Sequence, residues 1–207
     1  MRGLEQIPWL YDAGMALLER GGIGRWRAWL AKGATGRTLD LGTGTGRNLP
    51  LYPPGVRAVA VDPHPENVAR ARARAPAVPL VLARAEALPF RDRAFDTVVS
   101  GLVLCSVTDP DQALGEARRV LRPGGALRLL EHVRERGLRG AIQDFVQPAW
   151  TAISGGCRPN RETEAAVERA GFRIEPESVR RSGTMRRLQA RAPAAPATPL
   201  PGGVRGA

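Results

Sequence analysis

Short apolar segments alternate with amphipathic stretches along the middle of the chain. The apolar segments have the length of strands, and several of the stretches between them have the spacing of helices. This alternation is typical of βαβ units and predicts an α/β fold with a parallel sheet. The expected strands cover residues 37–41, 57–61, 78–83, 94–100 and 126–131.

Helix signals separate the expected strands. One helix is expected over residues 65–75 and another over 110–121. Asp109 precedes Pro110, so we expect Asp109 to cap the second helix and Pro110 to occupy its first position. The turn at Arg122-Pro123-Gly124-Gly125 ends that helix.

The chain after the fifth strand is expected to hold two helices and a hairpin. The helices lie near 138–154 and 160–170, and the second is expected to be capped by Asn160 and closed by Gly171. The hairpin strands, 172–179 and 184–192, would add an antiparallel edge to the sheet.

The pattern divides the chain into three parts. Residues 1–35 hold two helical patterns, Trp9–Arg20 and Arg25–Ala31, which form a helical cap that packs on the sheet edge, covers a substrate, or does both. Residues 36–192 form the main domain. Residues 193–207 are rich in Pro, Ala and Gly and are expected to be disordered.

The first two strands carry the motif that points to chemistry. Leu39-Asp40-Leu41 runs directly into Gly42-Thr43-Gly44-Thr45-Gly46, and the second strand ends on Asp62. Glycines at the end of a strand let the backbone approach a ligand closely, and an acid at the next strand end accepts two ribose hydroxyls. The pair predicts a nucleoside site.

The spacing of the glycines narrows the ligand. The turn is Gly-x-Gly-x-Gly and not the Gly-x-Gly-x-x-Gly that binds a dinucleotide pyrophosphate. Asp40 would repel a phosphate but suits a ligand with cationic groups, such as the ammonium and sulfonium of S-adenosylmethionine. The motif therefore favours an S-adenosylmethionine site over a nicotinamide site or a purely structural turn.

Composition fits one globular domain with a basic surface. The chain has 207 residues, 43% of them hydrophobic, and a net charge of +11, and Lys32 is its only lysine. Scattered arginines favour a compositional bias over a nucleic-acid site, while contact with an anionic membrane surface stays open. No membrane span or signal peptide is expected.

The two cysteines favour a reducing, cytoplasmic setting. Cys105 and Cys157 are too few for a disulfide framework, and their spacing does not suggest zinc. We therefore expect no metal site. Cys105 lies in an apolar run and is interpreted as pocket lining, as are Cys157 and Trp150.

Residues 37–131 resemble the class I S-adenosylmethionine-dependent methyltransferases. The matching segments are LDLGTGTGRNL, AVDPHPE, AEALPFRDRAFDTVVS and EARRVLRPGGALRLLEH, in that order. The resemblance implies a Rossmann-like, mostly parallel sheet of seven strands in the order 3-2-1-4-5-7-6, with the last strand antiparallel and helices on both faces.

The resemblance also implies roles in cofactor binding. Gly42, Thr43 and Gly44 would surround the methionine part, with Asp40 near its ammonium, and Asp62 would bind the ribose. The remaining expected cofactor residues are Tyr11, Pro63, Ala85, Glu86 and Gly101. Many relatives carry Asp where this chain has Arg84, so one adenine contact differs.

The segments LVLCSV, EHV, QPAW and GGCRPNRET resemble a narrower subgroup that includes the alkyl-thiol S-methyltransferases. This resemblance implies a small, lipophilic acceptor, with a thiol as the first choice. His132 at the end of the fifth strand and Asp144 on the following helix are the candidate catalytic groups. Their alternatives are a histidine that orders the strand end and an acid on a solvated helix face.

Several other functions remain open from the sequence. Phospholipid headgroup N-methylation would use the basic surface, and methylation of a quinone precursor is a more distant option. An RNA methyltransferase is disfavoured, because Gly101-Leu102-Val103-Leu104 stands where an Asn/Asp-Pro-Pro-aromatic tetrapeptide would act on base amino groups. A protein that binds the cofactor without turnover is the non-enzymatic alternative.

Overall fold

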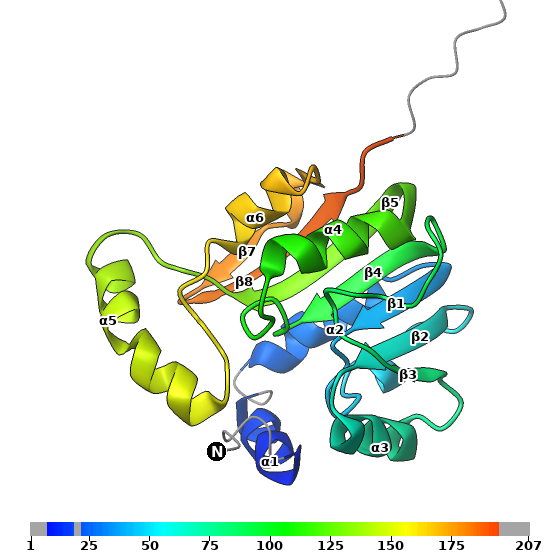
Figure 1. Ribbon diagram of the computed structural model, residues 1–207, viewed down its shortest axis with the longest axis horizontal. Helices are drawn as coiled ribbons and strands as arrows, with labels where there is room; N and C mark the ends of the chain where they lie inside the picture. The colour runs from blue at the N-terminus through cyan, green and yellow to red at the C-terminus, as the bar shows by residue number, and fades with distance from the viewer. Residues whose placement is uncertain (1–7, 19–21, 195–207) are drawn as a thin grey trace, which may run out of the picture.

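A single mixed sheet forms the centre of the molecule in the computed structural model, which describes residues 8–18 and 22–194 (Figure 1). Its strand order is β3-β2-β1-β4-β5-β8-β6, with β7 paired to β8. The strands are β1 (Arg37–Leu41), β2 (Arg57–Asp62), β3 (Leu80–Leu82), β4 (Phe95–Gly101), β5 (Leu121–His132), β6 (Arg173–Ile174), β7 (Arg180–Ser182) and β8 (Met185–Arg191).

The sheet confirms the expected class of fold and its antiparallel edge. Strands β1 to β5 pair in parallel, and β8 runs antiparallel to β5. The structure has eight strands where seven were expected, because the segment 172–179 is not one strand. Pro176 has no N–H to donate to a ladder and opens a short 3-10 helix, Pro176–Ser178, between β6 and β7.

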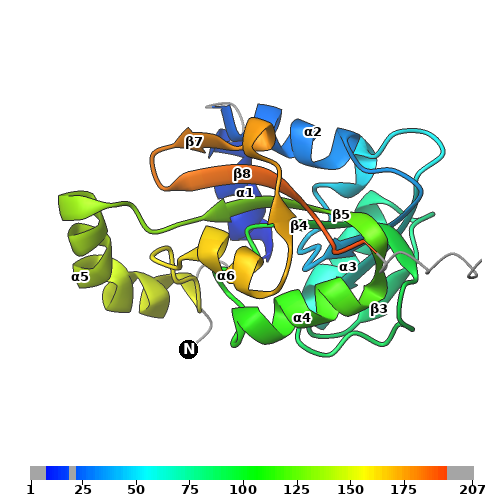
Figure 2. The same cartoon turned by 90° about the horizontal axis from the view of Figure 1, so that it is seen from above.

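Helices cover both faces of the sheet (Figure 2). They are α1 (Pro8–Leu18), α2 (Gly24–Lys32), α3 (Pro65–Arg74), α4 (Pro110–Val120), α5 (Gly137–Ser154) and α6 (Thr163–Arg169), with a 3-10 helix at Leu49–Leu51. Neighbouring residues of β4 show the two faces. Val98 packs in the cluster that contains Leu114 of α4, whereas Val99 packs with Leu30 of α2.

Helix boundaries agree with the sequence signals at α4 but not at the start of α6. The carboxylate of Asp109 accepts a hydrogen bond from the N–H of Gln112 at 3.0 Å, as expected of an N-cap. The predicted cap at Asn160 is wrong, because α6 begins at Thr163. The Asn160 side chain instead donates to Asp144 Oδ1 at 3.0 Å. Gly171, with φ +85°, follows the last turn of α6 as predicted.

The terminal regions are described in part. The two helices expected within residues 1–35 correspond to α1 and α2. Of the tail expected over 193–207, residues 195–207 lie outside the described part of the chain.

Helix α5 stands apart from the sheet, at one end of the molecule in both views (Figures 1 and 2). Its exposed apolar side chains are Leu138, Ile142, Phe145, Val146, Trp150 and Ile153. Their spacing places them along one side of the helix. Within residues 8–18 and 22–194, no helix has the length and apolar character needed to cross a membrane.

Candidate functional site

A cavity of about 410 Å³ opens at the carboxyl ends of the parallel strands. It is lined by segments that follow β1, β2, β3 and β4, the edge of an α/β sheet where ligands bind. Eight of the predicted cofactor residues line it: Gly42, Thr43, Gly44, Asp62, Pro63, Ala85, Glu86 and Gly101.

The glycine-rich turn forms one wall of the cavity. Gly42 has φ +61°, and a Cβ there would lie 2.6 Å from Val103. Gly44 has φ +56°, and a Cβ there would meet nothing within 4 Å. Both positions need glycine for their backbone conformation, and Gly42 needs it also for space. The open space beside Gly44 leaves its backbone accessible to a ligand.

Asp62 lies at the end of β2 with both carboxylate oxygens fixed. Oδ2 accepts from the N–H of Gly44 at 2.8 Å, while Oδ1 accepts from the N–H of His64 at 3.0 Å and from Asn67 Nδ2 at 3.1 Å. The carboxylate is thus held in place before a ligand arrives. A carboxylate has about four acceptor sites and three are occupied here, so Asp62 can accept one ribose hydroxyl directly and a second only by giving up one of these bonds.

Asp40 lies beneath the turn and does not line the cavity, so the expected interaction with the ligand ammonium would pass through an intervening group. It is fully buried, and it accepts hydrogen bonds from Asn48 Nδ2 at 3.2 Å and Thr43 Oγ1 at 3.3 Å. Burial raises the pKa of Asp40 to about 6, against the lowering effect of those bonds and of the Arg27 charge. Asp40 acts on the site through Thr43 and Asn48.

Arg27 and Asn48 are cavity residues that the sequence motifs did not single out. The guanidinium of Arg27, on α2, donates to Asn48 Oδ1 at 2.8 Å, and only 5% of Arg27 is exposed. A buried cation in this wall suits the carboxylate of the methionine part of the cofactor. Arg27 lies in the helical pattern before the first strand, which was interpreted as packing on the sheet edge or covering a substrate. Asn48 lies within the segment LDLGTGTGRNL but was given no role.

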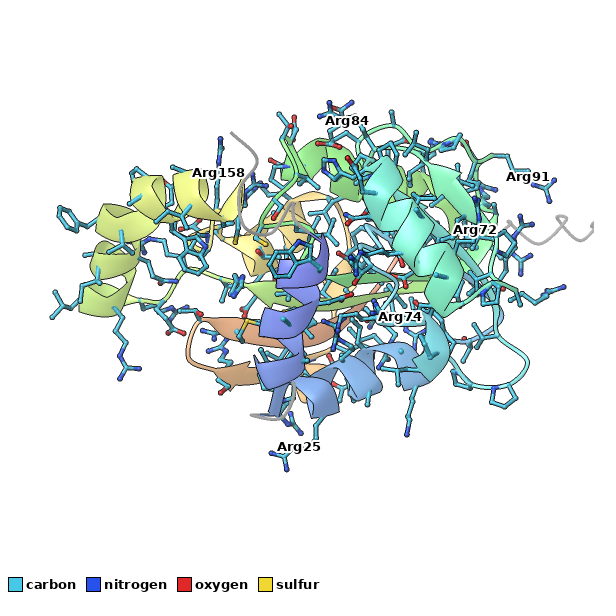
Figure 3. All side chains as sticks on the ribbon, turned by 90° about the horizontal axis from the view of Figure 1, so that it is seen from below. Arg25, Arg72, Arg74, Arg84, Arg91 and Arg158 are labelled. Atoms are coloured by element: carbon cyan, nitrogen blue, oxygen red, sulfur yellow. The ribbon has the colours of Figure 1, made fainter. Side chains whose placement is uncertain are left out.

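Glu86 holds the far wall together. Its Oε1 accepts from the N–H of Thr108 at 2.9 Å, and Arg84 Nη2 donates to Thr108 Oγ1 at 3.0 Å. The first of these bonds and others to Glu86 lower the pKa of its carboxyl, although burial opposes them. Arg84 extends from this wall toward solvent (Figure 3). The backbone around Ala85 is therefore fixed beside the cavity.

The N-terminal residues near the site are described only in part. The side chain of Tyr11 lies outside the described part of the chain. Its neighbour Asp12 accepts from Thr45 Oγ1 at 2.7 Å and pairs with Arg47 at 3.1 Å and Arg74 at 2.9 Å. These contacts tie α1 to the glycine-rich turn and to α3.

His132 does not line the cavity but belongs to a cluster with both cysteines. Its Nδ1 lies 3.8 Å from Cys157 Sγ, and Cys105 completes the group. The Cys105 thiol donates a hydrogen bond to the Cys157 sulfur. This hydrogen bond lowers the pKa of Cys157 and raises that of Cys105. Neither cysteine lines this cavity, and Trp150 does not line it either, although Ser106 and Gly155 near the cysteines do.

Asp144 lies on α5 and does not line the cavity. Its Oδ2 accepts from Arg134 Nη2 at 2.8 Å and its Oδ1 from Asn160. The Arg134 bond is the main reason that the pKa of Asp144 is lowered. An exposed carboxylate held by an arginine is a poor proton acceptor at neutral pH.

Comparisons with known proteins agree with this geometry. Residues 39–129 match the family model described as a methyltransferase domain. A solved S-adenosylmethionine-dependent methyltransferase from Thermotoga maritima shares the fold with a TM-score of 0.69 at 22% identity, covering 91% of this chain and 97% of that one. One from Methanosarcina mazei gives 0.62 at 23% identity, covering 77% and 93%. Residues 39–129 thus match a methyltransferase domain, and the chain shares its fold with S-adenosylmethionine-dependent methyltransferases.

Curated relatives give a narrower comparison. The chain is 40% identical over 151 residues to human thiol S-methyltransferase TMT1B, which covers 68% of this chain and 62% of the relative. It is 38% identical over 143 residues to human thiol S-methyltransferase TMT1A, covering 65% and 59%. Phosphatidylethanolamine N-methyltransferase of Cereibacter sphaeroides is 36% identical over 115 residues, covering 52% and 57%. The chain spans about three fifths of the length of these relatives.

Proposed function

We propose that the chain transfers a methyl group from S-adenosylmethionine to a small, lipophilic thiol. The observation that carries the proposal is the cavity, where an open glycine-rich turn and the fixed carboxylate of Asp62 face the same space. The thiol rests on the relatives named thiol S-methyltransferases, at 38–40% identity. When bound, S-adenosylmethionine supplies an electrophilic methyl group on a sulfonium.

In this proposal each wall of the cavity binds one part of the cofactor. Asp62 accepts the ribose hydroxyls, and the backbone at Gly42–Gly44 surrounds the methionine part with Arg27 at its carboxylate. Pro63 and the backbone at Ala85–Glu86 lie along the adenine. Gly101 at the end of β4 offers its carbonyl to the ammonium. Holding donor and acceptor in line supplies most of the rate, up to about 7–11 kcal/mol in ideal systems.

A thiol acceptor needs little help from a general base. A thiolate is populated to a few per cent near neutral pH and is a strong nucleophile. The leaving group becomes a neutral thioether, so no acid is needed at that end. This agrees with a cavity that neither His132 nor Asp144 lines.

Phospholipid headgroup N-methylation is the second candidate, and α5 is the observation that favours it. Phe145 is 86% exposed on an apolar face that no described element covers, and Arg136 and Arg139 lie on the same segment. Such a helix suits peripheral contact with an anionic membrane surface. The same surface would also deliver a lipophilic thiol, so we propose membrane contact with either acceptor. The two free cysteines support a reducing, cytoplasmic compartment.

Deuterated methyl transfer separates the candidates. The protein is incubated with S-adenosylmethionine carrying a CD3 group and, in parallel, with hexanethiol, hexanol or phosphatidylethanolamine vesicles. We expect a CD3-labelled thioether from the thiol alone. A labelled phospholipid without labelled thioether would replace the first candidate by the second. Bound cofactor with no labelled product from any acceptor would favour the non-catalytic alternative.

A further inference from the structure

Both cysteines of the chain meet at one point of the fold. Cys105 comes from the loop after β4 and Cys157 from the turn after α5, and His132 at the end of β5 completes the group. The two sulfur atoms and a ring nitrogen of His132 all lie within 4.8 Å of one another. The chain has only two cysteines and two histidines. Three of these four side chains converge here, although they are distant in sequence.

One separation between the ligand atoms is close to that of a tetrahedral zinc site, and all three are within 4.8 Å. Zinc binds sulfur at about 2.3 Å and imidazole nitrogen at about 2.0 Å, which places neighbouring ligand atoms roughly 3.5–3.8 Å apart. The observed separation of Cys157 Sγ and His132 Nδ1 is 3.8 Å. Two thiolates and one imidazole form a donor set that favours zinc over harder divalent cations.

Hydrogen bonds hold the ligand segments in this arrangement without a metal. The N–H of Arg158 donates to the carbonyl of Cys105 at 2.8 Å, which joins the two cysteine segments directly. Thr151 Oγ1 donates to the carbonyl of Cys157 at 2.9 Å, and the N–H of Cys157 donates to Ser154 Oγ at 3.2 Å. Both cysteines are 1% exposed. Such backbone support keeps ligand side chains in position to bind a metal.

We propose that Cys105, His132 and Cys157 bind one zinc ion, and that its fourth position binds the acceptor thiol. Among the described residues, no further histidine or carboxylate lies close enough to these three side chains to serve as a fourth ligand. Three protein ligands with one open position distinguish catalytic zinc sites from closed structural ones. Ser106 and Gly155, near the two cysteines in the chain, line the cofactor cavity, so the site lies against its wall. The identity of the fourth ligand rests on the proposed function.

The proposed step is a displacement at carbon. The acceptor thiol releases its proton to solvent and coordinates zinc as a thiolate. Its sulfur forms a bond to the methyl carbon while the bond between that carbon and the sulfonium breaks. The electron pair of the broken bond stays on the sulfur of S-adenosylhomocysteine. The product thioether is uncharged and a weaker zinc ligand than a thiolate, so it leaves the site.

Metal content tests the site independently of activity. The full chain is produced with added zinc, desalted and analysed by plasma mass spectrometry, alongside Cys105→Ser, Cys157→Ser and His132→Ala. His64→Ala is the matched control, because His64 is the only other histidine and is exposed beside the cavity. We expect about one zinc per chain in wild type and in His64→Ala, and at least tenfold less zinc per chain in the other three.

Cobalt substitution tests the ligands and the open position. Co²⁺ in the wild-type site is expected to give the near-ultraviolet charge-transfer bands of cobalt–thiolate bonds, and hexanethiol is expected to change the visible bands whereas hexanol is not. A folded wild type that binds S-adenosylmethionine but no zinc would overturn the site and leave the proposed methyltransferase intact. A cobalt spectrum unchanged by thiol would overturn the fourth ligand. Zinc binding without any S-adenosylmethionine binding would overturn the proposed function instead.

Discussion

The end that holds the glycine-rich turn and Asp62, proposed to bind the cofactor (the cofactor end), and the end that holds α5 and the Cys105–His132–Cys157 cluster, proposed to bind the acceptor (the acceptor end), are built in different ways. At the cofactor end, Asp62 and Asp40 are buried and fixed by hydrogen bonds from groups within 18 residues of each other in the chain. At the acceptor end, α5 exposes a row of large apolar side chains, and the Cys105–His132–Cys157 cluster joins three distant segments. At the cofactor end, the polar side chains are held in place by the chain itself. At the acceptor end, apolar side chains and ligand atoms are left available for a substrate, a metal or a membrane.

Two phenylalanines give the largest expected contrast. Phe95 is fully buried and packs edge to face on Phe90 with ring centres 5.0 Å apart, whereas Phe145 is 86% exposed. Phe95→Ala is expected to lower the free energy of unfolding by about 3–5 kcal/mol. Phe145→Ala should change it by less than about 0.5 kcal/mol. Urea denaturation measures both, and a similar loss in the two variants would show that α5 is packed in solution.

The buried Asp40 predicts a pH dependence specific to the cofactor end. Its pKa is about 6 in the folded chain and near 3.8 when unfolded, so between these values the folded state binds more protons. The contribution of Asp40 to stability therefore falls as pH rises from 4 to 7, by roughly 3 kcal/mol. The Asn side chain of Asp40→Asn does not titrate. The free energy of unfolding of wild type should therefore fall by about that much relative to Asp40→Asn between pH 4 and 7. A stability difference between the two that stays constant from pH 4 to 7 would contradict the assigned burial.

Asp62→Ala removes the proposed ribose acceptor. We expect the affinity for S-adenosylmethionine to fall about 30-fold, or about 2 kcal/mol, the scale of a hydrogen bond to a charged group. Asp111→Ala is the control, since Asp111 forms an exposed pair with Arg169 and does not line the cavity. Calorimetric titration gives both affinities. Equal affinity in folded Asp62→Ala and in the control would show that Asp62 does not bind the ribose.

Two glycines give the smallest expected change in stability and the clearest contrast in binding. Gly115 lies on the exposed side of α4, where an added Cβ meets nothing within 4 Å, so Gly115→Ala should stabilise the chain by about 1 kcal/mol without changing cofactor affinity. Gly42→Ala, with φ +61° and Val103 in its way, should weaken cofactor binding. Thermal unfolding and calorimetry check the pair. A Gly42→Ala protein with wild-type affinity would show that the turn adapts and is not a rigid wall.

The sequence predicted most of the cofactor end because its signals are local. The glycine turn follows β1 directly, Asp62 ends β2, and Asp109 caps α4 through a residue three positions away. Such features depend on neighbours within one turn or one strand end. The burial of Asp40 could not be predicted, because the motif does not show that Asn48 and Thr43 donate hydrogen bonds to its carboxylate.

The acceptor end could not be predicted in the same way. Sequence motifs for zinc sites require ligands that are close together in the chain. Cys105, His132 and Cys157 come from three distant segments, so no such motif contains them. Arg27 reaches the cavity from α2, a helix whose pattern shows only that it is amphipathic. The cap at Asn160 failed because Asp144, far along the chain, binds its amide. In each case the decisive neighbour is set by tertiary structure.

Calorimetric titration of the full chain with S-adenosylmethionine, and separately with NADH, tests which cofactor the cavity binds. We expect one S-adenosylmethionine site per chain with micromolar affinity and no heat from NADH. Folded protein that gives no heat with S-adenosylmethionine, or that binds NADH in its place, would contradict the assignment of the cavity.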